Sequence, residues 1–62
     1  MSLRVLIVDD EPLARAGVRA RLDGHADVSV IGECGDGASA LASLRSQPPD
    51  LLFIDVEMPG LS

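Results

Sequence analysis

Three aspartates in this sequence follow directly after runs of apolar residues. Asp9 and Asp10 follow residues 3–8 (LRVLIV), and Asp55 follows residues 51–54 (LLFI). If the two runs are neighbouring strands, the three carboxylates converge at one place, where like charges raise one another's pKa values. A divalent cation removes that cost, and oxygen ligands of this kind suit Mg²⁺. Such a site could carry out phosphoryl transfer, in which an aspartate can itself be the nucleophile that forms an acyl phosphate.

The order of apolar and turn-forming segments predicts three strands that alternate with two helices. Residues 3–8 and 51–54 are almost continuously apolar, which is typical of strands covered on both faces of a sheet. A third strand is expected at residues 28–31, and an extension to Glu33 or Cys34 is left open. Strands that alternate with helices imply βαβ units with right-handed crossovers, and therefore a parallel sheet. In such a sheet ligands bind at the carboxyl ends of the strands, where the three aspartates are expected.

The two helices are bounded by prolines, glycines and one aspartate. Pro12 suits the first position of a helix over residues 13–22, and Asp36 suits the N-cap of a helix over residues 38–46. Helical spacing favours an inward stripe in each helix, with the arginines of the first helix turned to solvent. The expected inward residues are Leu13, Gly17, Val18, Ala20 and Leu22 in the first helix, and Ala38, Leu41, Ala42 and Leu44 in the second.

The composition indicates one small acidic domain. Of the 62 residues 47% are hydrophobic and only Phe53 is aromatic, so the core must be aliphatic. A formal net charge of −5 argues against binding of nucleic acid or of an anionic membrane by bulk electrostatics. The sequence shows no apolar run of membrane-spanning length and no signal-peptide pattern, so a cytoplasmic location is the default expectation. Cys34 is expected to be a buried free thiol, and His25 an exposed loop residue.

Spacing alone leaves the role of the acidic residues open. Acids at strand ends are often only solvated or helix-capping residues, and this reading applies to Asp10, Glu11 and Asp55.

Two strings of the sequence resemble the receiver domain of bacterial two-component response regulators. LRVLIVDDEPLAR contains an acidic pair like the one that follows the first strand of that family, and LLFIDVEMPG places Asp55 like its phosphoacceptor. Met58-Pro59-Gly60 resembles the family's loop after this aspartate, and residues 32–38 (GECGDGA) resemble its passage from second strand to second helix. The resemblance covers essentially the whole chain. The run DDEPLAR is also similar to the LytR/AlgR subgroup, whose output domains bind DNA.

The resemblance implies an α/β fold, a flavodoxin-like doubly wound parallel sheet with strand order 2-1-3-4-5. It implies that Asp55 accepts a phosphoryl group from a sensor histidine kinase in a phosphorelay. It also implies that Asp10 and Asp55 ligate Mg²⁺ directly, that Asp9 assists through water, and that the backbone carbonyl of Glu57 is a further ligand. DNA would be bound only through an output domain outside this chain. The module would not be an enzyme with turnover, because the phosphotransfer is self-catalysed in the complete domain.

The sequence departs from the family beyond its third strand. The family uses a Ser or Thr after its fourth strand and a Lys after its fifth, and this chain contains no lysine or threonine. Residues 1–62 are therefore expected to be the N-terminal portion of a receiver, the β-α-β-α-β front half, unable to complete the switch alone. The strand at residues 51–55 would then leave an apolar edge through which the chain associates with itself.

Two other functions remain open from the residues. The first is a binding or oligomerisation module, or an inactive receiver fragment, that is never phosphorylated. The second is a phosphohydrolase of the haloacid-dehalogenase type, which also uses an aspartate after a strand. That family requires an Asp two residues beyond the nucleophile, where this chain has Glu57, and a lysine, which the chain lacks.

Overall fold

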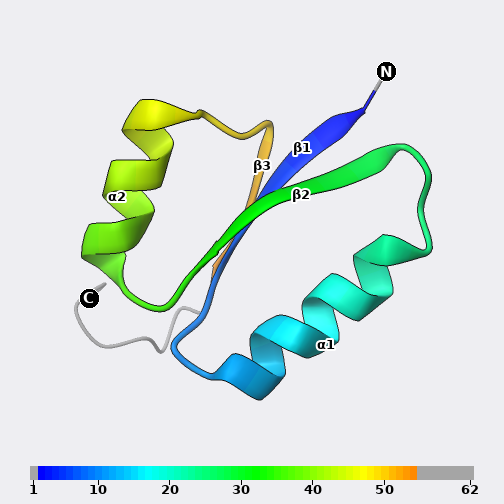
Figure 1. Cartoon of the computed structure of the whole chain (residues 1–62), viewed down its shortest axis with the longest axis horizontal. Helices are drawn as coiled ribbons and strands as arrows, with labels where there is room; N and C mark the ends of the chain where they lie inside the picture. The colour runs from blue at the N-terminus through cyan, green and yellow to red at the C-terminus, as the bar shows by residue number, and fades with distance from the viewer. Residues whose placement is uncertain (1, 55–62) are drawn as a thin grey trace.

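The computed structural model of the chain describes residues 2–54. These residues form β1 (Leu3–Val8), α1 (Pro12–Asp23), β2 (Val28–Cys34), α2 (Gly37–Ser46) and β3 (Leu51–Ile54), in that order (Figure 1). The strand bounds expected for β1 and β3 are confirmed, and β2 takes its longer form, which ends at Cys34.

The three strands form one parallel sheet with the order β2-β1-β3. The helices lie on opposite faces of this sheet, α1 on one side and α2 on the other (Figure 1). The expected α/β architecture is confirmed, and its strand order is the 2-1-3 part of a flavodoxin-like sheet. In the described part of the chain neither helix is long and apolar enough to cross a membrane.

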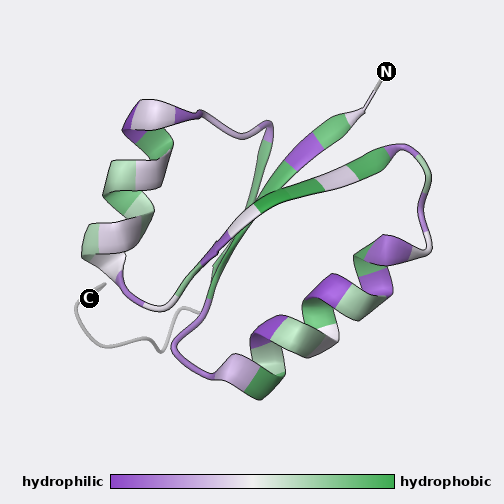
Figure 2. Ribbon diagram, in the orientation of Figure 1, coloured by the Kyte–Doolittle hydropathy of each residue, from purple (hydrophilic) through white to green (hydrophobic). Residues whose placement is uncertain are grey.

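The core lies on β1, the central strand. Its residues Val5, Leu6, Ile7 and Val8 are at most 2% exposed, because β1 is paired on both edges and covered on both faces. Hydrophobic residues accordingly run along the strands in the middle of the molecule (Figure 2). On the α2 side a cluster of buried residues fills the space between sheet and helix; it consists of Leu6, Val8, Cys34 and Ala40, with Leu44 packed against it.

A β-bulge interrupts the pairing of β1 with β2. Val5 pairs with Val30, but the next residue of β1, Leu6, pairs with Gly32, so Ile31 is an extra residue in β2. Beyond the bulge Glu33 lies beside Ile7. Since paired residues of parallel strands point to the same face and successive residues alternate, the bulge places Glu33 on the face covered by α1.

The expected inward stripe of α1 is wrong, apart from Val18 and Leu22. No residue of α1 is buried, and Leu13 is 84% exposed. The side of α1 that meets the sheet carries Arg15, Val18 and Leu22, which are partly buried. Arginine stems can cover apolar surface while their charged heads find partners, so a face that contains arginine need not point to solvent.

The expected inward stripe of α2 is also wrong, apart from Leu44. Ala40 is the buried residue of α2, whereas Ala38 and Ala42 are exposed and Leu41 is 56% exposed. Small residues occur all round this helix, so helical spacing does not single out one face. A contact of 3.5 Å between Cys34 Sγ and Ser43 Oγ accompanies the observed orientation.

Candidate functional site

The carboxyl ends of β1 and β3 lie side by side. The two strands are parallel, and their pairing ends with Val8 beside Ile54. Asp9 follows Val8, and it lies where the sequence predicted, at the carboxyl edge of the sheet. Asp55 follows Ile54 in sequence, but Asp55 and Glu57 lie outside the described residues.

Asp9 is held through its backbone and through one carboxylate oxygen. Its N–H donates to the carbonyl of Cys34 at 3.0 Å, and its own carbonyl accepts from Arg15 Nη1 at 2.5 Å. Its Oδ1 accepts the N–H of Glu11 at 2.9 Å, which shapes the turn between β1 and α1. Within the described residues the hydrogen bonds of this carboxylate engage Oδ1 and leave Oδ2 for another partner. Asp10 is exposed in the same turn.

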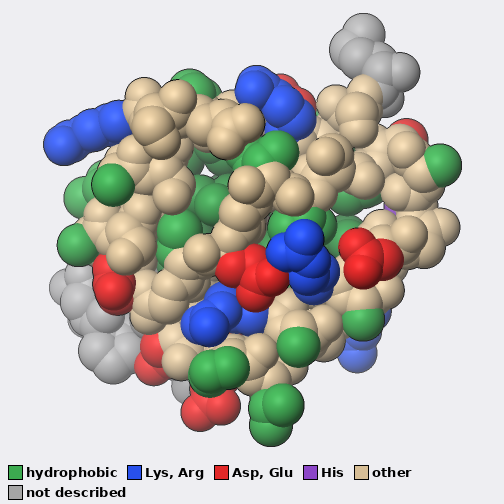
Figure 3. All heavy atoms as spheres, viewed as in Figure 1, with side chains coloured by type: hydrophobic (Ala, Val, Ile, Leu, Met, Phe, Trp, Pro, Cys, Tyr) green, Lys and Arg blue, Asp and Glu red, His purple; other side chains and the backbone are tan. Residues whose placement is uncertain are grey.

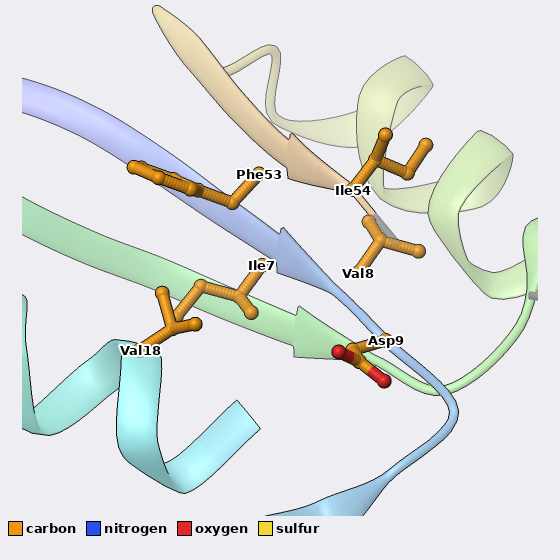
Figure 4. A pocket seen from close by; sticks show the side chains of 6 residues that line it. All are labelled: Ile7, Val8, Asp9, Val18, Phe53 and Ile54. Carbon is orange, nitrogen blue, oxygen red and sulfur yellow. The ribbon is translucent and has the colours of Figure 1, made fainter. Parts of the chain in front are cut away.

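A hollow of about 190 Å³ opens beside Asp9 at this edge (Figure 4). Its other walls are apolar; they are Ile7, Val8, Val18, Phe53 and Ile54. In Figure 4 the carboxylate of Asp9 lies just beyond the end of the strand that carries Ile7 and Val8. Apolar walls strengthen the attraction between a carboxylate and a cation, because they replace water of high dielectric constant.

Two arginines of α1 bind one glutamate of β2. Arg19 Nη1 lies 2.6 Å from Glu33 Oε2, and Arg15 Nε lies 3.5 Å from Glu33 Oε1. In Figure 3 acidic and basic side chains meet accordingly in the middle of the visible face. The prediction that the arginines of this helix mostly face solvent is therefore wrong for Arg15, whose side chain is 21% exposed. The two arginines are four residues apart and therefore lie on one side of α1, which is a sequence signal for a shared acidic partner. The sequence does not identify this partner as Glu33, because the β-bulge is what places Glu33 on the face covered by α1.

Other residues singled out in the sequence have structural roles. Asp36 is the N-cap of α2, as predicted, and its Oδ1 accepts the N–H of Ser39 at 2.7 Å. This hydrogen bond from the backbone lowers the pKa of Asp36 below its ordinary value. Cys34 is a buried free thiol, and His25 is an exposed loop residue, both as expected.

Asp50 stands at the other end of the sheet, just before β3. Its Oδ2 accepts the N–H of Arg4 at 2.8 Å, and this backbone hydrogen bond lowers the pKa of Asp50. This contact was not predictable from the sequence, because it depends on the pairing of β1 with β3.

The predicted Mg²⁺ ligands lie partly inside and partly outside the described residues. Among residues 2–54 no three side chains of Asp, Glu, His or Cys come together as a metal-binding group. The predicted set, however, includes Asp55 and Glu57, which lie outside that range. The donors that are described, Asp9 and Asp10, supply the oxygen chemistry that Mg²⁺ prefers.

Residues 5–62 match the family model described as "Response regulator receiver domain". The chain belongs to this family. The transcriptional regulatory protein BtsR of Salmonella typhi is 45% identical over 60 residues, which cover 97% of this chain and 25% of that protein. The chain thus spans about a quarter of the length of the curated relatives it matches.

Solved receiver structures share the fold. The signal receiver domain of the response regulator NarL from Mycobacterium tuberculosis superposes with a TM-score of 0.88 at 42% identity, over 95% of this chain and 48% of that one. The isolated receiver domain of RcsB from Salmonella enterica, solved with the phosphomimetic BeF3-, gives a TM-score of 0.91 at 32% identity, over 97% and 44%. The receiver interpretation of the two sequence strings is therefore confirmed.

Proposed function

We propose that this chain receives a phosphoryl group on Asp55 from a histidine of a sensor kinase, as part of a transcriptional response regulator. The observation that carries the proposal is the pairing of β1 with β3, which ends with Val8 beside Ile54. Asp9 follows Val8 in sequence and Asp55 follows Ile54, and this order supports a shared site for the two acids. A receiver domain is a signalling module that in general works with a partner kinase, which supports the choice of donor.

The proposed reaction transfers one phosphoryl group. A carboxylate oxygen of Asp55 forms a bond to phosphorus, and the bond from phosphorus to the histidine nitrogen of the kinase breaks. The product is an acyl phosphate, and the electron pair of the broken bond returns to the histidine. Asp9, Asp10, Asp55 and the carbonyl of Glu57 would hold Mg²⁺, which when bound neutralises the charge of the transferred group. Asp9 fits this role because its Oδ1 is already fixed by Glu11 and its position is therefore set in advance.

The output of the proposed switch lies outside the chain. The relative BtsR is called a transcriptional regulatory protein, and RcsB has been solved bound to a promoter in the presence of BeF3-. We infer that the longer protein acts on DNA through a separate output domain, since the net charge of −5 does not favour contact through this segment. Membership of the LytR/AlgR subgroup and a cytoplasmic location stay predictions.

Labelling by acetyl phosphate tests the proposal. In the complete receiver domain, acetyl phosphate with Mg²⁺ should add one phosphoryl group, read by intact-protein mass, and EDTA should prevent it. Asp55→Asn should abolish the added mass. Asp50→Asn is the matched control, because Asp50 stands at the opposite end of β3 and should not affect labelling. Labelling that persists in Asp55→Asn would show that another residue is the acceptor.

A second role, self-association, is favoured by the exposure of β3. In residues 2–54 β3 pairs with β1 alone, and its four apolar side chains are 37–42% exposed. An apolar strand whose edge is open is a template for pairing with another strand. We propose that the 62-residue chain associates through this edge.

A further inference from the structure

The side chain of Arg15 contacts three parts of the chain near Asp9, namely the carbonyl of Asp9, Glu33 on β2 and the backbone at Gly35. From α1, its Nη1 donates to the carbonyl oxygen of Asp9 at 2.5 Å. Its Nε lies 3.5 Å from Glu33 Oε1 on β2. The same guanidinium lies so close to the backbone after β2 that a Cβ added at Gly35 would come within 3.3 Å of Nη1. The side chain is 21% exposed, so it is packed into the fold rather than extended into solvent.

We propose that Arg15 is a positioning residue that fixes the direction of the Asp9 carboxylate. The inference rests on the proposed function only in that the carboxylate serves the Mg²⁺ site. Asp9 is tied on one side by its N–H to Cys34 and on the other by its carbonyl to Arg15. Together these bonds set the two peptide planes that flank the Cα of Asp9. The direction of the Cα–Cβ bond is thereby set, and the N–H of Glu11 then holds Oδ1 of the side chain.

An arginine suits this position better than a lysine. A guanidinium is planar and carries five N–H donors in a rigid fork, so it can serve a carbonyl and a carboxylate at once. Arg15 uses two different nitrogens for these two acceptors, Nη1 for Asp9 and Nε for Glu33. A lysine has one nitrogen at the end of a flexible stem, so it cannot present two separate donor atoms in a fixed plane.

Arg19 provides a matched comparison within the same helix. It binds the same glutamate, with Nη1 only 2.6 Å from Glu33 Oε2. Its hydrogen bond goes to Glu33, whereas Arg15 also reaches the carbonyl of Asp9. Loss of either arginine therefore removes an ion pair to β2, but loss of Arg15 alone also releases Asp9.

Binding of Mn²⁺, used as a probe for the Mg²⁺ site, tests the proposal in the full 62-residue chain. Arg15→Gln should weaken Mn²⁺ binding about tenfold, at the low end of the range for groups that orient a metal ligand. Arg19→Gln should leave it within about twofold, although this variant also loses an ion pair to Glu33. Arg15→Lys should fall between the two. Equal Mn²⁺ affinities for the Arg15→Gln and Arg19→Gln variants would overturn the proposal.

Hydrogen exchange without metal separates this proposal from the phosphoryl-transfer one. The N–H of Glu11 donates to Asp9 Oδ1, so its exchange reports how firmly that carboxylate is held. Arg15→Gln should speed the exchange of this amide, and Arg19→Gln should not. If exchange responds as expected but the unmutated chain binds no Mn²⁺, Arg15 positions Asp9 and the proposed metal site is wrong. If the Glu11 amide exchanges alike in both variants, Arg15 does not position Asp9.

Discussion

Substitution of Asp9 by Asn and by Ala separates two roles of this residue, building the turn and binding a cation. In the structure the N–H of Glu11 donates to Oδ1 of Asp9 at 2.9 Å. Asn at position 9 keeps an oxygen that can accept this N–H, but it removes the charge. Ala removes both. A hydrogen bond of this kind contributes about 1 kcal/mol, so Asp9→Ala should lower the free energy of unfolding by about that amount. Asp9→Asn should change it by less than about 0.5 kcal/mol.

The charge of Asp9 should matter for the cation instead. Two unit charges about 4 Å apart in water attract by about 1 kcal/mol, so a divalent ion held through water gains about 2 kcal/mol from this carboxylate. Since each 1.4 kcal/mol is a factor of ten, the loss of affinity is about 30-fold at low salt. Screening at physiological ionic strength reduces it to about tenfold.

Two measurements on the same variants test this division. Urea unfolding followed by circular dichroism gives the stabilities, and titration with Mn²⁺ gives the affinities. We expect both variants to bind Mn²⁺ about tenfold more weakly, while only Asp9→Ala is less stable. If Asp9→Asn binds Mn²⁺ as the unmutated chain does, Asp9 only builds the turn, and the reasoning that places a cation beside it is refuted.

Three further substitutions test the fold around the site. Leu6→Ala removes a side chain that is 2% exposed and should lower the free energy of unfolding by about 2–5 kcal/mol. A domain of 62 residues has roughly 3–9 kcal/mol in total. Urea unfolding measures the loss, and Leu13→Ala, at an exposed position, is the control. Asp36→Ala should lower the Tm at neutral pH and not in strong acid. The Ser39 amide lowers the pKa of Asp36, so its stabilisation is present above pH 3.8 and disappears as the pH falls through the folded pKa. Phe53→Lys should reduce self-association in sedimentation velocity, because a charge on an edge strand opposes pairing; unchanged association would show that β3 is not the contact.

The strands and the place of Asp9 could be predicted because the relevant signals are local. Residues 3–8 and 51–54 are apolar with a single interruption at Arg4, and turn-forming residues bound them, so both strands were found with their observed limits. Asp9 follows the first run directly, so its place at the end of β1 follows from the bounds of that strand. The strand order came from the family resemblance, and the structure confirms it for these three strands.

The helix faces could be predicted only in part, because they depend on contacts with residues far away in sequence. Leu13 was expected to face the sheet, yet Arg15 does so, since Glu33 on β2 supplies a partner for its charge. The sequence does contain one overlooked signal. Gly32 inside an apolar strand is a common mark of a bulge, and the extra residue of β2 is its neighbour Ile31.

The extra residue of β2, Ile31, affects the contacts of Asp9 through Glu33 and Arg15. Without the bulge, regular pairing would bring Glu33 beside Val8, on the face filled by the apolar cluster under α2. Burial of an unpaired carboxylate there would cost several kcal/mol, a large part of what a small domain has. Arg15 would also lose the carboxylate that holds its guanidinium against the carbonyl of Asp9. The proposed orientation of the Asp9 carboxylate therefore depends on Ile31, a residue that does not itself line the hollow beside Asp9.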